Sequence, residues 1–413
     1  MSVNKYDWIV VGGGISGIAV SEILSRGGRS VLLIEKNEKL ASETTKVFHE
    51  WFHSGSLYSL APDKLQTLRY LLGATDDLFE YYESFPKMNL YPTEQGTKVK
   101  GEGWFNDDNV EYRYKKHLIN PVWTSLVSRS INIIDSLNKH DWLRRRAGSN
   151  YSEEKVNFSH WFNKIIELNK GNSEFYCKAS PDVTINSRRL LKDILTSATE
   201  EGLSIITDKR VNNISENKDG VVVEADGINF KSDKVVICSP DLISKLLGIP
   251  IKTSFAPMAV VEEVPEDEKS FVELDYNTRK CINLLKKTGG VGQAGGISLK
   301  RKDDIESYLS YIIAEHKKRN PSIKVVDTYI GLKKELVMKG EDRNYLYHIN
   351  QNSTRVWSIV LGKFSLAFSM APEFYRRIYL ENPPKLIKKS IKSIKIDNLS
   401  ETSWKEIILK SRE

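Results

Sequence analysis

The hydrophobic positions near the start of the chain follow two different periods. Residues 8–11 (WIVV) and 31–34 (VLLI) are short apolar runs, whereas residues 15–25 carry apolar side chains at helical spacing. Short apolar runs of this kind are typical of buried strands, and a spacing of three to four residues is typical of a helix that buries one face. The pattern therefore predicts a strand, a turn, a helix and a second strand within a unit of about 30 residues.

The turn of this unit contains the spacing G-x-G-x-x-G at Gly12, Gly14 and Gly17. Gly12 permits a tight turn, Gly14 lets a pyrophosphate approach the backbone, and Gly17 lets the helix pack closely on the strand. Glu35 ends the second strand at about the expected interval of 20 positions, where its carboxylate would accept hydrogen bonds from a ribose. This context predicts a dinucleotide site, although the motif alone does not choose between FAD and NAD.

Later segments alternate between helical and strand patterns. Helical spacing covers residues 65–82, 122–143, 160–168, 186–201, 305–317 and 364–379. Strand-like or irregular patterns cover residues 87–118, 203–238, 255–264, 271–285, 324–329 and 356–361. The glycine-rich residues 289–296 lack the Lys-Ser/Thr of a phosphate loop, so a hairpin or loop is expected there.

This order of elements predicts an α/β chain, α+β overall, in which a Rossmann-like domain is interrupted twice by a mixed α/β substrate domain. The nucleotide-binding domain is expected in three segments, residues 1–85, 181–250 and 324–380. The substrate domain is expected in two segments, residues 86–180 and 251–323. Residues 381–413 form a basic C-terminal tail.

Length and composition narrow the class of protein. A chain of 413 residues is expected to form two to three structural units. Its three cysteines are far apart without C-x-x-C spacing, and no set of His, Asp and Glu has metal-ligand spacing, so neither disulfides nor a metal site is expected. No run of about 18 apolar residues and no export signal occurs, which indicates a cytoplasmic protein.

The charge pattern has one exceptional stretch. The net charge is +7, but both signs are interspersed along most of the chain, so nucleic-acid binding is not expected. In residues 385–395 (KLIKKSIKSIK), lysines from Lys385 to Lys395 surround three isoleucines at helical spacing. This stretch could contact the inner face of an anionic membrane, but a solvated helix whose isoleucines cover the protein body is favoured, because the stretch is short and has no aromatic anchor.

Three separated segments together resemble the FAD-dependent oxidoreductases of the D-amino-acid oxidase superfamily, nearest the branch of glycerol-3-phosphate and 2-hydroxyglutarate dehydrogenases. The first is residues 9–36 (IVVGGGISGIAVSEILSRGGRSVLLIEK). The second joins residues 186–214 (NSRRLLKDILTSATEEGLSIITDKRVNNI) to residues 219–239 (DGVVVEADGINFKSDKVVICS). The third is residues 356–374 (VWSIVLGKFSLAFSMAPEF). The resemblance implies a two-dinucleotide-fold flavoprotein whose FAD domain contains all three.

The resemblance also implies which residues hold the cofactor. The pyrophosphate would contact the first turn, at Gly12, Gly14, Ile15, Ser16 and Gly17. The adenosine ribose would lie beside Glu35 and Lys36, and the adenine beside the backbone of Val211. The phosphates and ribityl chain would touch the turn formed by Thr44, Thr45 and Lys46.

The pyrimidine end of the flavin would meet a helix N-terminus formed by Gly362, Lys363, Phe364 and Ser365. Backbone amides at such a terminus stabilise the negative charge that builds on the flavin N1 and O2 during reduction. At this position, the physical argument and the resemblance agree.

Departures from the family's pattern limit the substrate that can be named. The family's Gly-Gly is Leu-Gly at residues 361–362, an arginine of the final helix is replaced by Phe368, and another arginine is replaced by Leu-Lys at residues 332–333. Because lysine does not reproduce bidentate phosphate recognition, glycerol 3-phosphate itself is doubtful as the substrate. The Cys-Ser-Pro at residues 238–240 is closer to the amine-oxidase and desaturase branches.

Candidate catalytic groups come from two segments. His53 resembles a histidine of the 2-hydroxyacid branch, whereas His49 fits the glycerol-phosphate branch when residues are counted from the 44–46 turn without a gap. A histidine in an aromatic segment is more often structural. Lys363 could contact flavin O2 or a substrate carboxylate, or could be an exposed helix-start lysine. An anionic substrate could be held by Arg279, Lys333 and Arg343, although most such side chains are solvated.

The sequence thus predicts an FAD-dependent dehydrogenase or oxidase that takes hydride from a CH–OH or CH–NH carbon of a small polar metabolite, such as a hydroxy acid, a polyol derivative or an amino acid. Electrons would pass to oxygen, a quinone or a carrier protein. Two alternatives stay open: a binding protein that uses the fold without redox chemistry, or an amine-oxidase-like flavoenzyme. An NAD(P) dehydrogenase is a third.

Overall fold

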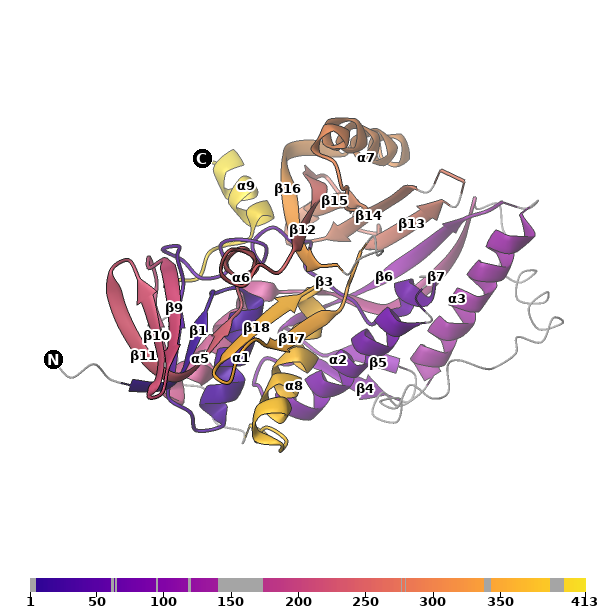
Figure 1. Cartoon of the computed structure of the whole chain (residues 1–413). Helices are drawn as coiled ribbons and strands as arrows, with labels where there is room; N and C mark the ends of the chain where they lie inside the picture. Colours follow the sequence, from indigo (N-terminus) through magenta and orange to yellow (C-terminus); the bar gives the residue numbers. More distant parts are fainter. Residues whose placement is uncertain are drawn as a thin grey trace.

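The described part of the chain forms two eight-stranded sheets, a two-stranded hairpin and the helices around them (Figure 1). The computed structural model describes residues 5–60, 63, 65–93, 96–117, 120–139, 174–275, 277–278, 280–337, 343–386 and 397–413. The helical pattern expected at residues 160–168 and nearly all of the basic stretch at 385–395 lie outside these ranges.

The first sheet has the strand order β17-β18-β11-β1-β2-β8, with β10 paired to β11 and β9 to β10. Its central strands pair in parallel, as β1 does with both β2 and β11. In chain order the strands are β1 (Lys5–Val11), β2 (Val31–Ile34), β8 (Ser204–Ile206), β9 (Val211–Asn217), β10 (Gly220–Ala225), β11 (Ile228–Ile237), β17 (Tyr347–Gln351) and β18 (Val356–Leu361).

The two faces of this sheet are both buried, because side chains alternate along each strand. Trp8 and Val10 pack in a core with helices α1 (Ile15–Arg26), α2 (Gln66–Tyr82), α5 (Ser187–Glu200) and α8 (Ala367–Tyr379). Ile9 and Val11 pack on the other side, with β9, β10 and Ile243 of α6 (Pro240–Leu247). Near-continuous apolar runs such as WIVV are what a doubly covered parallel sheet requires.

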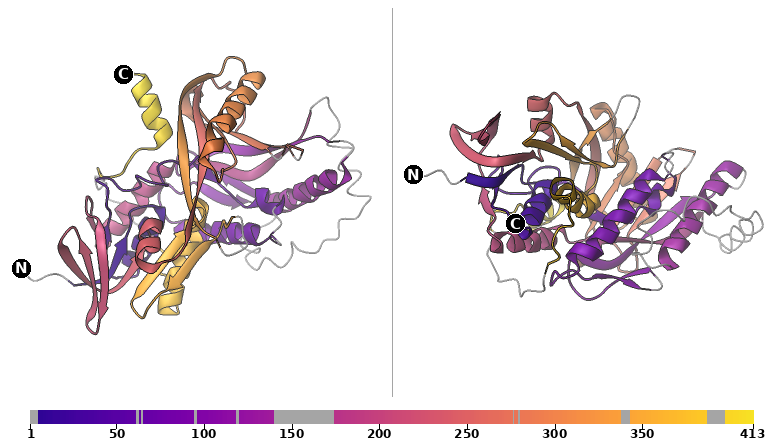
Figure 2. Two further views of the ribbon diagram at one scale, coloured as in Figure 1. Left: turned by 45° about the horizontal axis from the view of Figure 1, so that its top comes forward. Right: turned by 60° about the horizontal axis from the view of Figure 1, so that its bottom comes forward.

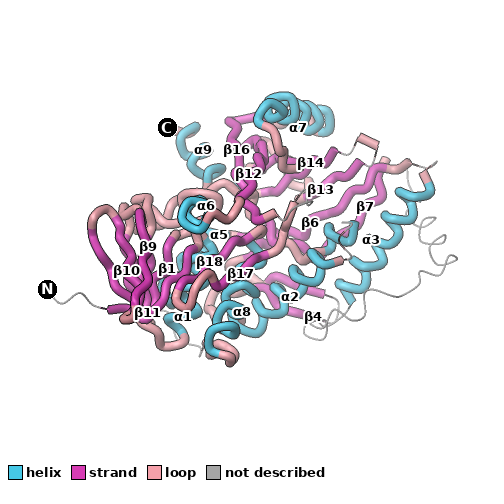
Figure 3. Tube along the Cα trace, in the orientation of Figure 1, coloured by secondary structure: helices cyan, strands magenta, loops and turns pink. Residues whose placement is uncertain are grey.

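The second sheet has the strand order β16-β12-β15-β14-β13-β6-β7-β3 (Figure 3). Its strands are β3 (Trp51–Phe52), β6 (Phe105–Lys115), β7 (Phe175–Ile185), β12 (Ile251–Glu262), β13 (Phe271–Asp275), β14 (Lys280–Lys286), β15 (Gly292–Gly296) and β16 (Lys324–Leu336). A separate hairpin joins β4 (Leu90–Thr93) and β5 (Gly96–Val99).

Helices cover both faces of the second sheet (Figure 2). Helix α3 (Pro121–Lys139) packs on Val272 and Leu285, whereas α7 (Ile305–Arg319) packs on the neighbouring Phe271 and Leu284, whose side chains point to the opposite face. The C-terminal helix α9 (Ser403–Ser411) lies beside β12 and β16. Short 3₁₀ turns are η1 (Ser56–Leu60), η3 (Thr288–Gly290), η4 (Lys302–Asp304) and η5 (Phe364–Leu366).

The strand expected at residues 324–329 is longer than predicted. β16 continues through Gly331 to Leu336, because it pairs with nearly the whole of β12. A Cβ at Gly331 would lie 2.9 Å from the carbonyl oxygen of Val47, so the glycine serves close packing within a strand rather than a turn. β16 belongs to the second sheet, and the domain boundary expected at residue 324 stays a prediction.

Two further expectations concern the glycine-rich segment and membrane-spanning helices. The glycine-rich residues 289–296 form the last part of the turn after β14 and the strand β15, and these two strands pair in antiparallel, so the predicted hairpin is confirmed. Among the described residues, no helix is long and apolar enough to cross a membrane.

Candidate functional site

A cavity of about 330 Å³ lies where the first sheet meets β12 and β16 of the second. It begins at the ends of β1 and β2, passes the start of α1, and reaches the turn after β18. Because loops at the carboxyl ends of parallel strands open onto one edge of a sheet, this is the edge at which ligands of such folds bind. Segments far apart in the chain converge here.

Most of the predicted cofactor residues line this cavity. Those that do are Gly12, Gly14, Ile15, Ser16, Glu35, Lys36, Thr44, Thr45, Val211, Gly362, Lys363 and Phe364. Gly12, Val211 and Gly362 come from three distant segments, so the structure brings together the parts that the sequence comparison had joined only by resemblance.

The first glycine turn has the geometry expected of its motif. Gly12 has φ +108°, which disfavours any residue with a side chain. A Cβ at Gly17 would lie 1.9 Å from the carbonyl oxygen of Gly12, so only glycine permits this approach of helix and turn. Gly14 caps α1 without a side-chain hydrogen bond, and the amide of Ile15 donates to the Thr45 hydroxyl at 3.1 Å. The start of α1 therefore presents backbone amides to the cavity.

Glu35 is buried and held in place at the end of β2. One of its carboxylate oxygens accepts a hydrogen bond from the amide of Gly13 at 2.6 Å, and the other accepts from the amide of Asn37 at 2.9 Å. Lys36 forms an ion pair with Glu43 at 3.1 Å. A fixed carboxylate next to the glycine turn fits a ribose that hydrogen-bonds through its hydroxyls.

Three of the predicted cofactor residues do not line the cavity. Gly17 lies within the first turn of α1, where it serves packing. The Ser365 hydroxyl accepts a hydrogen bond from the amide of His53 at 3.0 Å. Lys46 points the other way and forms an ion pair with Glu406 of α9 at 2.7 Å, so it does not stand where a phosphate contact was expected.

Both candidate histidines line the far end of the cavity, which we call the chamber. Burial and the charge of Lys363 together lower the pKa of His53 to about 4, although Asp182 opposes the shift. Burial also places the pKa of His49 well below its usual value, with Lys333 as the next cause. Both imidazoles are therefore neutral near pH 7 and able to accept a proton.

The His53 ring is oriented by an aromatic ring and by a carboxylate. It stacks on Trp51 with a centroid distance of 4.1 Å, and its Nδ1 lies 3.6 Å from the carboxylate of Asp182. Asp182 is fully buried and accepts hydrogen bonds from the Trp51 indole at 2.9 Å, the Ser54 amide at 2.8 Å and the Tyr112 hydroxyl at 2.6 Å. Burial alone would raise the pKa of Asp182, but these contacts and His53 hold it below its usual value.

Sequence reasoning missed Asp182, because nothing near it in the chain marks it. It lies in β7, 128 positions from Ser54, and reaches the histidine only because β3 pairs with β7. An isolated aspartate between apolar strand residues was the one available signal.

Two lysines without a carboxylate partner in the described structure face the chamber. Burial lowers the pKa of Lys333 to about 8, with the nearby Arg343 as the next cause. Burial also sets the pKa of Lys363 well below its usual value, and its ammonium lies 4.8 Å from the rings of both Tyr58 and Tyr345. These amines make the chamber favourable for an anion.

Of the other predicted anion-binding residues, Arg343 is paired and Arg279 is not described. Arg343 donates two hydrogen bonds to the carboxylate of Glu335, from Nη2 at 2.8 Å and from Nε at 3.3 Å. The guanidinium of Arg343 is therefore already engaged by Glu335, and its effect on the chamber is that its charge lowers the pKa of Lys333. Arg279 lies outside the described residues.

A second buried network, also missed from the sequence, anchors the segment that carries His49. Glu50 accepts hydrogen bonds from Lys287 at 3.1 Å and from the Trp404 indole at 2.7 Å. Lys287 also donates to the carbonyl of His49 at 3.2 Å. The ion pair is almost fully buried, and Glu50 itself has φ +59°, so the backbone here is held by tertiary contacts.

In the described part of the chain, no group of three or more His, Cys, Asp or Glu side chains could hold a metal ion. The cavity is instead an elongated space with backbone amides at its centre and amines at one end. These donors fit an extended dinucleotide that carries phosphates in its middle.

Comparisons with known proteins agree with this geometry. A sequence model of the FAD dependent oxidoreductase (DAO) family matches residues 7–290. The UDP-galactopyranose mutase of Mycoplasma pneumoniae is 45% identical over 56 residues, which is 12% of this chain and 14% of the mutase. That match therefore spans only a small part of its relative.

Several solved structures share the fold over almost their full length. The L-proline dehydrogenase of P. horikoshii has a TM-score of 0.63 at 14% identity, covering 92% of this chain and 94% of that one. The FAD-bound L-α-glycerophosphate oxidase of Mycoplasma pneumoniae has a TM-score of 0.62 at 18% identity, covering 92% and 97%. The glycine oxidase of Geobacillus kaustophilus has a TM-score of 0.64 at 13% identity, covering 97% and 99%.

Proposed function

Because the chain belongs to the family of FAD-dependent oxidoreductases, its cofactor is FAD, and we propose that it oxidises a small anionic metabolite at a CH–OH or CH–NH carbon. The observation that carries the proposal is one cavity that runs from the first glycine turn to a chamber with two neutral histidines and two lysines that have no carboxylate partner among the described residues. The proposed binding places of cofactor and substrate are thus two ends of the same cavity.

We propose that the cofactor extends along the cavity, at the edge of the first sheet formed by the carboxyl ends of its parallel strands. The amides at the start of α1 face the pyrophosphate, Glu35 the adenosine ribose, and Val211 the adenine. The turn from Gly362 to Phe364 faces the pyrimidine end of the flavin, where its amides stabilise negative charge. When bound, FAD accepts the hydride at its N5, and the protein supplies orientation and proton transfer.

In this proposal, a histidine of the chamber accepts the proton that the substrate loses. A neutral imidazole that lines the chamber can take the proton from a substrate hydroxyl or ammonium as hydride leaves. His53 is the stronger candidate of the two, since Trp51 and Asp182 fix its ring and the carboxylate stabilises the imidazolium that forms. His49 has no such fixed carboxylate beside it and is the alternative base.

The lysines narrow the class of substrate. Lys333 and Lys363 are buried amines, and an anion bound beside them would favour their charged forms, so a carboxylate or phosphate group on the substrate would be stabilised there. Hydroxy acids, polyol phosphates and amino acids all carry such a group. The electron acceptor is proposed to be oxygen, a quinone or a carrier protein, and a membrane contact of the stretch at residues 385–395 stays a prediction.

The test begins with the purified protein's absorbance spectrum, which should show bound flavin. Anaerobic addition of hydroxy acids, polyol phosphates and amino acids should bleach the flavin with members of one class. Gly14→Leu should give flavin-free protein, whereas the matched Gly73→Leu, at a helical position with open space, should stay yellow. A flavin that no anionic substrate bleaches would contradict the redox role, and flavin retained by Gly14→Leu would contradict the binding site.

A further inference from the structure

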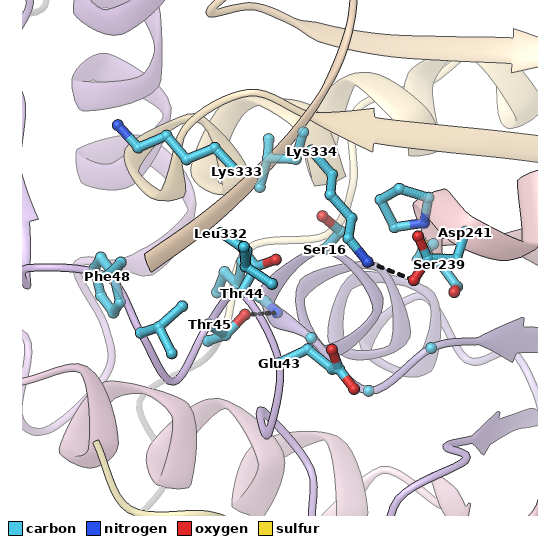
Figure 4. A pocket seen from close by; sticks show the side chains of 18 of the residues that line it. Ser16, Glu43, Thr44, Thr45, Phe48, Ser239, Asp241, Leu332, Lys333 and Lys334 are labelled. Atoms are coloured by element: carbon cyan, nitrogen blue, oxygen red, sulfur yellow. Dashed lines mark hydrogen bonds and ion pairs between the residues drawn. The ribbon is translucent and has the colours of Figure 1, made fainter. Parts of the chain in front are cut away.

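The central part of the cavity contains a lysine that comes from the other sheet. The family turn at residues 44–46 was expected to direct Lys46 toward the phosphates, but Lys46 pairs with Glu406 on the far side of that segment. Lys334 of β16 lines the cavity instead, together with Gly14 and Ser16 at the start of α1 (Figure 4). A cation is therefore present at this point, although it arrives from a different strand.

Lys334 and its neighbour Lys333 serve different ends of the cavity. Side chains alternate along a strand, and Figure 4 shows the two lysines leaving β16 in opposite directions. Lys333 faces the chamber, whereas Lys334 reaches toward Asp241, next to Ser239 at the start of α6. One strand of the second sheet thus supplies positive charge to two separate places.

The surroundings of Lys334 suit a ligand with negative charge. Its side chain is only 15% exposed, while its ion-pair partner Asp241 is 60% exposed. The charge of Lys334 is the last of the causes that act on the pKa of Glu43, after burial, Lys36 and Asn37, so its ammonium acts on the cavity wall. A mostly buried ammonium that is held by a solvated carboxylate can exchange that partner at small cost for a better-placed anion.

We propose that Lys334 is a pyrophosphate ligand of the bound cofactor, delivered by β16, and that Asp241 is the partner it gives up when the cofactor binds. The inference rests on the proposed function, since it requires FAD in this cavity. Lysine acts on phosphate as a point charge and complements the amides at the start of α1, which supply hydrogen bonds but little net charge. Cofactor binding would then tie β16 to the first sheet, because one ligand would contact both.

The experiment measures FAD affinity by titrating the deflavinated protein and following flavin fluorescence. Lys334→Gln should weaken FAD binding roughly 10- to 100-fold, the range expected for a lost charge-assisted contact, and should reduce its dependence on salt. Lys334→Arg should retain most of the affinity. Lys324→Gln is the matched control, since Lys324 lies on the same strand in an exposed ion pair with Glu263 and should change nothing.

Asp241→Asn separates the proposal from a purely structural ion pair. If Lys334 binds the pyrophosphate, this variant removes a competing carboxylate, so FAD affinity should stay the same or increase. If the pair only braces the two sheets, Lys334→Gln and Asp241→Asn should weaken FAD equally, which would overturn the inference. ADP, which carries the pyrophosphate, should lose affinity for Lys334→Gln, whereas riboflavin, which has no phosphate, should not.

The outcomes also distinguish this inference from the function on which it rests. A wild-type protein that binds neither FAD nor ADP would contradict the proposed cofactor site. Normal FAD binding by the wild-type protein and an unchanged affinity in Lys334→Gln would contradict only the role of Lys334. Thermal unfolding of the flavin-free variants should match the wild type, and a reduced stability in Lys334→Gln that Lys334→Arg does not restore would also count against the proposal.

Discussion

Lys333 predicts how the affinity for anions depends on pH. Its ammonium is buried in the chamber, and burial together with the charge of Arg343 lowers its pKa to about 8. Only the charged form attracts an anion, so binding should be strongest below pH 8 and weaken as the pH rises through this value. An unperturbed lysine, with a pKa of about 10.4, would show no such change near pH 8.

The size of the effect follows from the titration. One pH unit above the pKa, about one tenth of Lys333 is still protonated in the free enzyme, so the apparent affinity should fall about tenfold for each further pH unit. Lys333→Arg should make this fall shallower, because a guanidinium stays charged at every pH of the experiment. Lys333→Arg combined with Lys363→Arg should remove the rest of the fall, since the pKa of Lys363 is also lowered. Lys333→Met should bind anions weakly throughout the range.

The assay is a titration of the holoenzyme with sulfate and with acetate between pH 6 and pH 10, followed by the shift in flavin absorbance. Neither anion changes its charge over this range, so the protein alone sets the pH dependence. Lys324→Arg provides the control, since it makes the same exchange on the same strand at an exposed position. An alkaline fall in Lys333→Arg that is as steep as in the wild type would refute the assignment, and so would its absence in the wild type.

Three further predictions concern stability and cofactor retention. Lys287→Met should destabilise the protein by about 3–5 kcal/mol in urea unfolding, because it leaves Glu50 buried without its ion-pair partner, and a change below about 1 kcal/mol would contradict this. Gly17→Ala should cost about 1–3 kcal/mol and reduce bound flavin, since its Cβ would overlap the Gly12 carbonyl, while Gly73→Ala should do neither. Burial lowers the pKa of His53 and of His316 in α7 to about 4, below the unfolded value of 6.5. The folded state therefore keeps its full stability above pH 6.5 and loses at most about 3 kcal/mol for each histidine as the pH falls toward 4. Urea unfolding at pH 7, 5.5 and 4 checks this, and a free energy of unfolding that rises on acidification would be incompatible with it.

The first sheet was predictable because its signals are local. The glycine spacing, the two apolar runs and the helix between them lie within one short segment, and β1, α1 and β2 form where that pattern placed them. The helix expected at residues 186–201 is α5, and the closing strand and turn are β18 and η5. The α/β fold class and the FAD-oxidoreductase family are both confirmed.

The chamber was harder to predict because its contacts are not local. The role of Lys46 was taken from a three-residue turn, but its direction depends on Glu406, which is contributed by the far end of the chain. The same holds for Asp182 beside His53, which depends on the pairing of β3 with β7. A sequence pattern specifies which residue types are present in an element, whereas the direction of a long polar side chain is decided by partners that only the fold brings near.

The segment between the sheets explains how one short stretch of chain can serve both ends of the cavity. After Thr45 contacts the start of α1, the chain passes His49 and Glu50 and enters the second sheet as β3, just before His53. Within these few residues it passes from the proposed cofactor end of the cavity to the proposed substrate end, and the ion pair of Glu50 with Lys287 anchors the segment between them. Since β16 returns over the same cavity with Lys333 and Lys334, each end is built from both sheets. A displacement of one sheet relative to the other would therefore alter cofactor binding and substrate binding together, which is why variants at Lys334 should be examined for changes in anion affinity as well as in FAD affinity.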